Sequence, residues 1–209
     1  MVQNNVSGAP GRGRPRKFDT DTVMRRARDT FWRHGYAGTS MDQLAAATGL
    51  HKPSLYGAFG DKRQLYLEAL NRYLREAWAA LDLALREPDL WQGLNMLTEG
   101  EIALYTRDPD AAGCFMLSTA LPVAGGDDEI LAIVRSAMEA FDELLEQRFE
   151  RAIAAGDIPA DADVPGLVRL LATSHNDLSV RARAGYAPEQ LRAMAAETVR
   201  LAKRLAGQV

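Results

Sequence analysis

Apolar side chains recur at helical spacing along most of the chain, and no stretch alternates apolar and polar residues as a β-strand does. Gly and Pro residues separate the periodic stretches. We therefore expect longer helices over 19–34, 61–85, 90–106, 110–121, 127–155, 165–184 and 188–207. Together with two short helices between 39 and 60, the pattern predicts an all-α protein of about nine helices, with a three-helix head and a larger helical body.

The two short helical patterns are bounded by residues that start and stop helices. Ser40 is suited to cap the first helix, and Gly49 supplies the left-handed residue that ends it. Pro53 suits the first turn of the second helix, where its missing N–H is not needed. Leu55 and Phe59 form the buried side of that helix, which leaves outside Lys52, Pro53, Ser54, Tyr56 and Gly57. This layout is typical of a DNA-reading helix-turn-helix, and the alternative is a helical hairpin inside an all-α domain.

A basic segment lies directly before this head. It carries Arg12, Arg14, Arg16 and Lys17 between Gly and Pro residues, and no apolar side chain precedes Phe18 there. Such a segment cannot bury a face, so we expect a disordered arm over 1–17 whose arginines enter a minor groove and neutralise phosphates. One alternative is a basic tail without a DNA role, and another is a non-specific DNA-architectural protein. The position before a helix-turn-helix favours a DNA-binding arm.

Charge is distributed unevenly along the chain, although the net charge of its 209 residues is only −3. Residues 1–75 hold 13 Lys and Arg against 6 Asp and Glu. Residues 76–209 hold 12 Lys and Arg against 22 Asp and Glu. This asymmetry predicts a nucleic-acid-binding head on an acidic body that DNA repels.

Several other classes of protein lack support in the sequence. The first residues have neither the basic start nor the apolar run of a signal peptide, and the apolar stretch 111–124 is too short to span a bilayer. A single Cys excludes an intrachain disulfide, so we expect a soluble cytoplasmic protein with no membrane partner. No metal site, cofactor or enzyme activity is expected, because the His and Cys residues are widely spaced and no HExxH or Walker motif occurs. An enzyme would need a pocket of perturbed carboxylates.

Residues 18–67 resemble the tetracycline-repressor (TetR) family of bacterial transcription regulators. The positions that carry the resemblance are Phe31, Gly35, Tyr36, Thr39, Ser40, Leu44, Ala45, Gly49, Leu50, Ser54, Leu55, Tyr56, Phe59 and Lys62. The resemblance implies a homodimer that represses by binding a palindromic double-stranded DNA operator and leaves it when a small molecule binds the body. The domains implied are the arm 1–17, the DNA-binding domain 18–64 and the ligand-binding and dimerisation domain 65–209.

The resemblance also implies roles for single residues of the head. The DNA contacts implied are phosphate contacts from Thr39, Ser40, Tyr56 and Lys62, and base contacts from Lys52, Pro53, Ser54 and Gly57. The chain departs from the family pattern at His51, where Ser is frequent, and at Gly57 and Ala58, where bulkier side chains are frequent. We therefore expect Lys52, and not positions 57 and 58, to make the main base contact, because its ammonium favours guanine O6 and N7. The alternative for Lys52 is a phosphate contact alone.

The last two expected helices carry apolar stripes, formed by Leu167, Leu170, Leu171, Ser174 and Leu178 and by Leu191, Met194, Ala195, Thr198, Leu201 and Leu205. Two successive stripes favour a four-helix bundle with a second copy of the chain. The alternative is that both stripes pack within one subunit.

The effector is expected in a cavity among the large apolar side chains of the body. The candidates are Trp78, Trp91, Met96, Tyr105, Phe115, Met116, Met138 and Phe141. They favour an apolar or aromatic effector, and the alternative for each is ordinary core. His175 is the polar candidate, unless it is a structural His with a partner. Cys114 is either a buried small hydrophobe or a thiol that senses oxidants or electrophiles.

Overall fold

The computed structural model describes residues 18–207. The expected arm, with Arg14, Arg16 and Lys17, lies outside the described residues. All regular elements of the described part are helical, which confirms the all-α prediction. The elements are α1 (Thr20–Gly38), α2 (Met41–Thr48), α3 (Lys52–Phe59), α4 (Lys62–Leu85), α5 (Leu90–Tyr105), η1 (Pro109–Ala111), η2 (Met116–Ala120), α6 (Leu121–Ala124), α7 (Asp128–Ala155), α8 (Val164–Arg183) and α9 (Pro188–Leu205).

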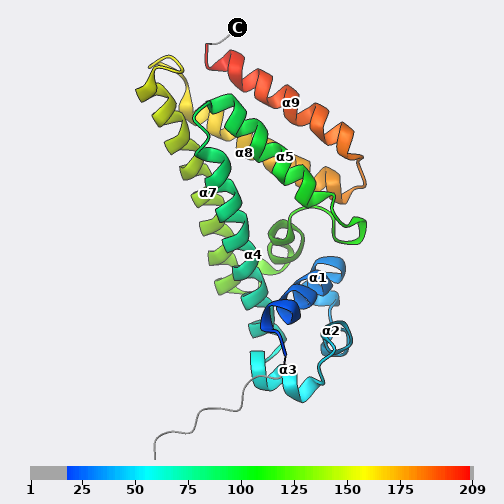
Figure 1. Cartoon of the computed structure of the whole chain (residues 1–209). Coiled ribbons are helices and arrows are strands. Elements are labelled where there is room, and N and C mark those ends of the chain that lie inside the picture. The colour runs from blue at the N-terminus through cyan, green and yellow to red at the C-terminus, as the bar shows by residue number, and fades with distance from the viewer. Residues whose placement is uncertain (1–17, 208–209) are drawn as a thin grey trace, which may run out of the picture.

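Helices α1, α2 and α3 form a head at one end of the molecule, and α4 runs from this head into the body (Figure 1). The expected domain boundary between 64 and 65 falls inside α4, which continues through it without a break. The body consists of α5 to α9 and of α4 beyond its first turn, which belongs to the head, and the 28-residue α7 lies alongside α4. Because a helix is stiff along its length, α4 connects the head mechanically to the body.

Side-chain caps determine where the head helices begin. Ser40 accepts a hydrogen bond from the backbone N–H of Gln43, and the Gln43 side chain accepts one from the N–H of Ser40. Asp61 begins α4 in the same way. The expected end of the first helical run at residue 34 is confirmed: Gly35 has a non-helical φ of 71° and produces a kink, after which a short second run carries α1 to Gly38.

The expected helix over 110–121 is also wrong. The chain instead forms the short η1, an extended stretch, the π-helical η2 and the four-residue α6. Gly113 has φ 78°, and a Cβ there would lie 2.7 Å from the carbonyl oxygen of Ser179, so close packing against α8 determines this turn. Ser118 and Thr119 donate their hydroxyls to the carbonyls of Cys114 and Phe115, and Pro122 supplies no N–H to the helix.

The apolar stripes of α8 and α9 are filled mostly within the subunit. Leu167, Leu171, Leu178, Leu191 and Ala195 are all buried in the single chain. This corrects the expectation that the two stripes need a second copy as their partner, because α5 and α7 already cover them. The apolar side chains left exposed on these helices include Val180, at 62%, and Leu205, at 57%.

Polar contacts tie the head to the body around a shared apolar core. Arg63 of α4 contacts the Asp127 carboxylate at 2.6 and 2.8 Å, just before α7. Arg33 of α1 pairs with Asp108 at 2.7 Å. Arg183 of α8 donates to the carbonyl of Trp32 at 3.1 Å. Three body segments thus hold the head in one orientation.

Asp127 provides a test of this head–body contact. The hydrogen bond from Arg63 lowers the pKa of the Asp127 carboxyl from 3.8 to about 2, so the carboxylate stabilises the folded protein above the unfolded pKa. That contribution is lost as the pH falls through about 2. We expect the wild type to lose more stability than Asp127→Asn between pH 4.5 and pH 2.5, measured by urea denaturation.

Asn at this position keeps the N-cap of α7, so the variant isolates the ion pair. Asp128→Asn, at the next and exposed position, should retain the pH dependence of the wild type. Identical pH profiles for the wild type and Asp127→Asn would contradict the role of the ion pair.

Candidate DNA-binding surface and effector cavity

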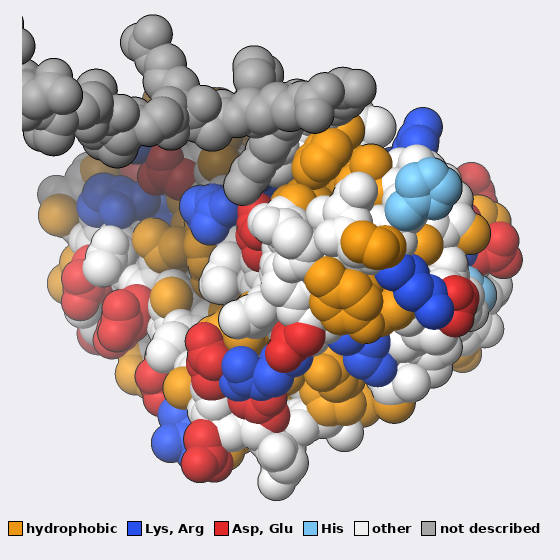
Figure 2. Space-filling view, turned by 90° about the horizontal axis from the view of Figure 1, so that it is seen from below, with side chains coloured by type: hydrophobic (Ala, Val, Ile, Leu, Met, Phe, Trp, Pro, Cys, Tyr) orange, Lys and Arg blue, Asp and Glu red, His pale blue; other side chains and the backbone are white. Residues whose placement is uncertain are grey.

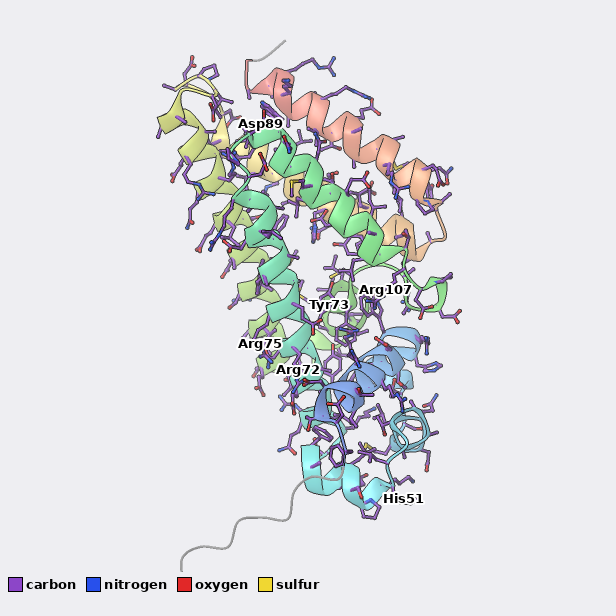
Figure 3. The ribbon with its side chains drawn as sticks, viewed as in Figure 1. His51, Arg72, Tyr73, Arg75, Asp89 and Arg107 are labelled. Carbon is purple, nitrogen blue, oxygen red and sulfur yellow. The ribbon has the colours of Figure 1, made fainter. Side chains whose placement is uncertain are left out.

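The outer side of α3 is exposed at the tip of the head. Leu55 and Phe59 are buried beneath it. The residues that the sequence placed on the outer side of this helix lie together on one exposed surface. This surface is formed by His51, Lys52, Pro53, Ser54, Tyr56 and Gly57. His51 lies at the far end of the molecule from the body (Figure 3). Seen from this end, Lys and Arg side chains lie among uncharged and hydrophobic ones, with acidic side chains between them (Figure 2).

Lys52 has a partner within the head. Its Nζ lies 2.7 Å from Asp42 Oδ1, in the first turn of α2, and this hydrogen bond raises the pKa of Lys52. The pair is well exposed, so it costs little to exchange in water. Any DNA group that Lys52 contacts must therefore compete with the Asp42 carboxylate.

Two of the side chains expected at phosphates have partners inside the head. Thr39 is 2% exposed, and its hydroxyl donates to the carbonyl of Gly35 at 2.7 Å. Lys62 Nζ donates to the carbonyls of Tyr36 and Thr39 at 3.0 and 3.1 Å and lies 4.5 Å from the centre of the Tyr36 ring. These bonds fix the α1–α2 turn on α4. A phosphate contact by either side chain would have to replace them, whereas Ser40 is exposed.

The body encloses a cavity of about 380 Å³. It lies between α1, α4, α5, α7 and α8 and the segment that follows η1. Of the expected ligand residues, those that line it are Trp78, Met96, Tyr105, Cys114, Met116, Met138, Phe141 and His175. Trp91 and Phe115 do not line it: Trp91 packs on the apolar cluster at the far end of the body, and Phe115 is fully buried beside Trp32.

An acid–base pair lies in the cavity wall. His175 Nδ1 lies 2.6 Å from Glu101 Oε1, and the Tyr105 hydroxyl lies 3.3 Å from the ring nitrogens. The His175 ring stacks on Phe141 with 4.5 Å between centres. Burial lowers the pKa of His175, but the charge and the hydrogen bond of Glu101 outweigh this effect and raise it overall. His175 thus has a partner, as the structural alternative predicted, and it also faces the cavity.

Cys114 is buried in the cavity wall. Its backbone N–H donates to the Ser179 hydroxyl at 2.8 Å, and the Tyr73 hydroxyl donates to its sulfur at 3.2 Å. Burial raises the pKa of the thiol, which disfavours the reactive thiolate.

Sequence reasoning missed cavity residues that carry charge or a hydroxyl, which are Arg28, Tyr73, Glu76, Glu101, Arg107, Asp142, Arg169 and Thr173. Glu101 had a signal, because it lies four residues after Leu97 and four before Tyr105 on the apolar side of α5. Arg28 and Arg107 had no such signal, since they line one cavity only because α1 packs on the body. Within residues 18–207, no group of His, Cys, Asp and Glu is arranged to hold a metal ion. The helices of this part include none long and apolar enough to cross a membrane.

Two family models match the chain. The model of bacterial regulatory proteins of the tetR family matches residues 23–69, and that of the tetracyclin repressor-like C-terminal domain matches residues 91–198. The chain is 31% identical over 192 residues to the HTH-type transcriptional repressor ComR of Escherichia coli K12, with 91% of each protein covered. It is 27% identical over 199 residues to the HTH-type transcriptional repressor BdcR of the same strain, with 94% of each covered.

Solved structures give the same result. A cysteine mutant of the TetR family regulator CifR, complexed with 26-bp double-strand operator DNA, matches with a TM-score of 0.79 and 34% identity over 90% of this chain and 98% of that one. A TetR-family regulator from Streptomyces coelicolor matches with a TM-score of 0.77, 17% identity and coverage of 90% and 95%, which shows the fold alone. A helix-turn-helix head on a helical body defines a DNA-binding transcription regulator. The chain belongs to the TetR family of bacterial transcription regulators.

Lys52 provides a test of base reading. The measurement is a gel shift over operator variants that each change one base pair. If the Lys52 ammonium contacts base edges, Lys52→Ala should weaken binding about tenfold or more to operators that keep the preferred base at one position, and little to operators in which that base is changed. Asp42→Asn should strengthen binding, because it removes the carboxylate that competes for Lys52. A loss spread evenly over all operator variants would instead show a phosphate contact.

Proposed function

We propose that the protein is a repressor that leaves its operator when a small molecule enters the cavity of the body. The observation that carries this proposal is that helix α1 of the head forms part of the cavity wall, through Arg28, while α4 lines the cavity with its second half, from Tyr73 to Ala84. A ligand that moves either helix therefore changes the position of α3. The regulator acts where operator DNA is, so we expect it in the cytoplasm.

A non-covalent ligand is favoured over a thiol switch. Cys114 lines the cavity, so a ligand would touch it, but burial raises the pKa of its thiol. The thiolate that oxidants and electrophiles attack is therefore scarce at neutral pH.

DNA recognition is tested with the duplex upstream of the protein's own gene, against a random duplex of the same length. We expect the upstream duplex to bind at least about a thousandfold more tightly at physiological salt, as for specific regulators. Equal affinity for the two duplexes would identify a non-specific DNA-architectural protein.

The ligand is then sought by thermal shift with small organic compounds, because a compound that binds the native state raises the Tm. A compound that does so should also release labelled upstream duplex. Ala137→Trp fills the cavity, since Ala137 lies in its wall, and should abolish both effects. A compound that acts equally on this variant binds elsewhere.

Dimerisation is proposed through the exposed side of α8 and α9. Leu201 and Leu205 leave apolar surface exposed on α9, and Val180 does so on α8. We expect the wild type to sediment as a dimer at micromolar concentration and Leu201→Glu with Leu205→Glu to sediment as a monomer, because charges oppose burial in an interface. Leu83→Glu, at an equally apolar and exposed position of α4, serves as the control and should remain a dimer. A monomeric wild type would overturn this interface.

A further inference from the structure

The end of the cavity next to the head carries two guanidinium groups around one buried indole. The Arg28 guanidinium carbon lies 5.8 Å from the centre of the Trp32 ring, and that of Arg107 lies 5.9 Å from it. Both arginines line the cavity. Arg28 belongs to α1, and Arg107 follows α5. Figure 3 shows Arg107 and Tyr73 at the junction of α1 with the body.

The two arginines differ in their partners. Arg28 NH1 lies 3.0 Å from Glu76 Oε2, and Arg28 NH2 lies 3.1 Å from Asp29 Oδ1. Arg107 is exposed, and the Asp108 carboxylate, which pairs with Arg33, also interacts with its charge. The buried Trp32 Nε1 has no acceptor within the described part of the chain. Of the charged residues that line this end of the cavity, Arg28 and Arg107 are basic and Glu76 is acidic.

The remainder of the cavity suits the uncharged part of a ligand. Its wall includes the apolar side chains of Leu74, Trp78, Leu81, Leu97, Met116 and Phe141. Glu101 is already paired with His175. Asp142 and Arg169, of opposite charge, lie on α7 and α8. At the end next to Trp32, a cationic ligand would meet two guanidinium groups, whereas an oxyanion would meet Arg107, whose neighbour Asp108 is paired with Arg33.

We propose that the cavity binds an amphipathic organic acid, with its carboxylate or sulfonate held by Arg107 and Arg28 beside Trp32. A guanidinium group presents a planar pair of donors that fits two oxygens of such a group. The apolar or aromatic part of the acid lies between α4, α5 and α7. This inference rests on the proposed function, because it names the chemical class of ligand for the same cavity.

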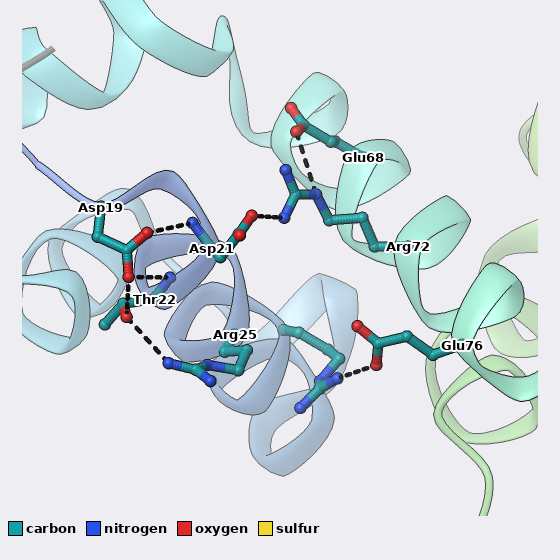
Figure 4. A network of polar contacts seen from close by, with 8 residues as sticks. Asp19, Asp21, Thr22, Arg25, Glu68, Arg72 and Glu76 are labelled. Carbon is teal, nitrogen blue, oxygen red and sulfur yellow. Dashed lines mark hydrogen bonds and ion pairs between the residues drawn. The ribbon is translucent and has the colours of Figure 1, made fainter.

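The position of Arg28 links this ligand to the head. The ion pair of Arg28 with Glu76 joins α1 to α4 at the cavity wall (Figure 4). A second ion pair between α1 and α4 joins Asp21 to Arg72 at 2.6 Å. Neither of these two residues lines the cavity. An oxyanion at Arg107 competes with Glu76 for Arg28. Its binding thus weakens one of the ties that hold the head on α4.

The test uses the full-length protein and two fluorescent probes of one scaffold. The first probe, 8-anilinonaphthalene-1-sulfonate, carries an oxyanion, and the second, N-phenyl-1-naphthylamine, is its uncharged counterpart. We expect Arg107→Met to weaken the sulfonate about tenfold or more and to leave the uncharged probe unchanged, since a charge-assisted hydrogen bond is lost only with the sulfonate. Equal effects on the two probes, or none on either, would falsify the inference.

Two further variants test the geometry. Glu76→Gln should strengthen binding of the sulfonate probe, because it removes the carboxylate that competes for Arg28. Arg169→Met removes the third arginine of the cavity wall, on α8 and outside the proposed oxyanion site, and should leave both affinities unchanged. If Arg169→Met, and not Arg107→Met, weakens the sulfonate, the oxyanion lies elsewhere and the assignment fails. Circular dichroism melts confirm that each variant is folded.

The release of labelled upstream duplex separates this inference from the proposed function. We expect the bound sulfonate probe to release the duplex. If the uncharged probe releases the duplex and the bound sulfonate does not, the organic-acid inference is wrong and the ligand-responsive repressor stands. If both probes fill the cavity and neither releases the duplex, both proposals fail.

Discussion

The structure depends on one aromatic cluster, in which the head helix α1 packs against the body. Trp32 contacts Phe115 and Tyr73 with 5.4 Å between ring centres, and Phe31 contacts Tyr66 at 5.1 Å. These rings belong to a single buried core that runs from α1 into α5 and α8. Large aromatic rings bury much area and pack in specific orientations, so the head cannot turn freely on the body. Other contacts between head and body surround this cluster.

One ring of this cluster also lines the cavity. Tyr73 contacts Trp32 and lies in the cavity wall, and Arg28 and Arg107, which line the cavity as well, lie 5.8 and 5.9 Å from the centre of the Trp32 ring. A close-packed core transmits displacement because it has little free volume. A change in the cavity is therefore felt first by α1 and α4, which are the two helices that place α3. This is the physical basis for coupling between a ligand in the body and DNA at the head.

Local signals predicted the helix limits where a residue acts on its own neighbours. Ser40 caps α2 and Gly49 ends it, as capping and left-handed geometry require. Prediction failed at 110–121, because the turn at Gly113 depends on its contact with Ser179, 66 positions later in the chain. Contacts between residues distant in sequence also decide the roles of side chains in the head. Thr39 and Lys62 have the residue types of phosphate contacts, yet their hydrogen bonds lie within the head.

The sequence by itself determined the all-α class, the helix-turn-helix and most of the aromatic and Met side chains that line the cavity, because periodicity and caps are local properties. Only the tertiary structure decided which charges meet. Glu101 pairs with His175, Lys52 pairs with Asp42, and Arg107 lies near the ring of Trp32, 75 positions earlier in the chain. It also decided that the stripes of α8 and α9 are largely filled within the subunit. Such pairings depend on how whole helices pack, and helical periodicity carries no information about which helix lies opposite.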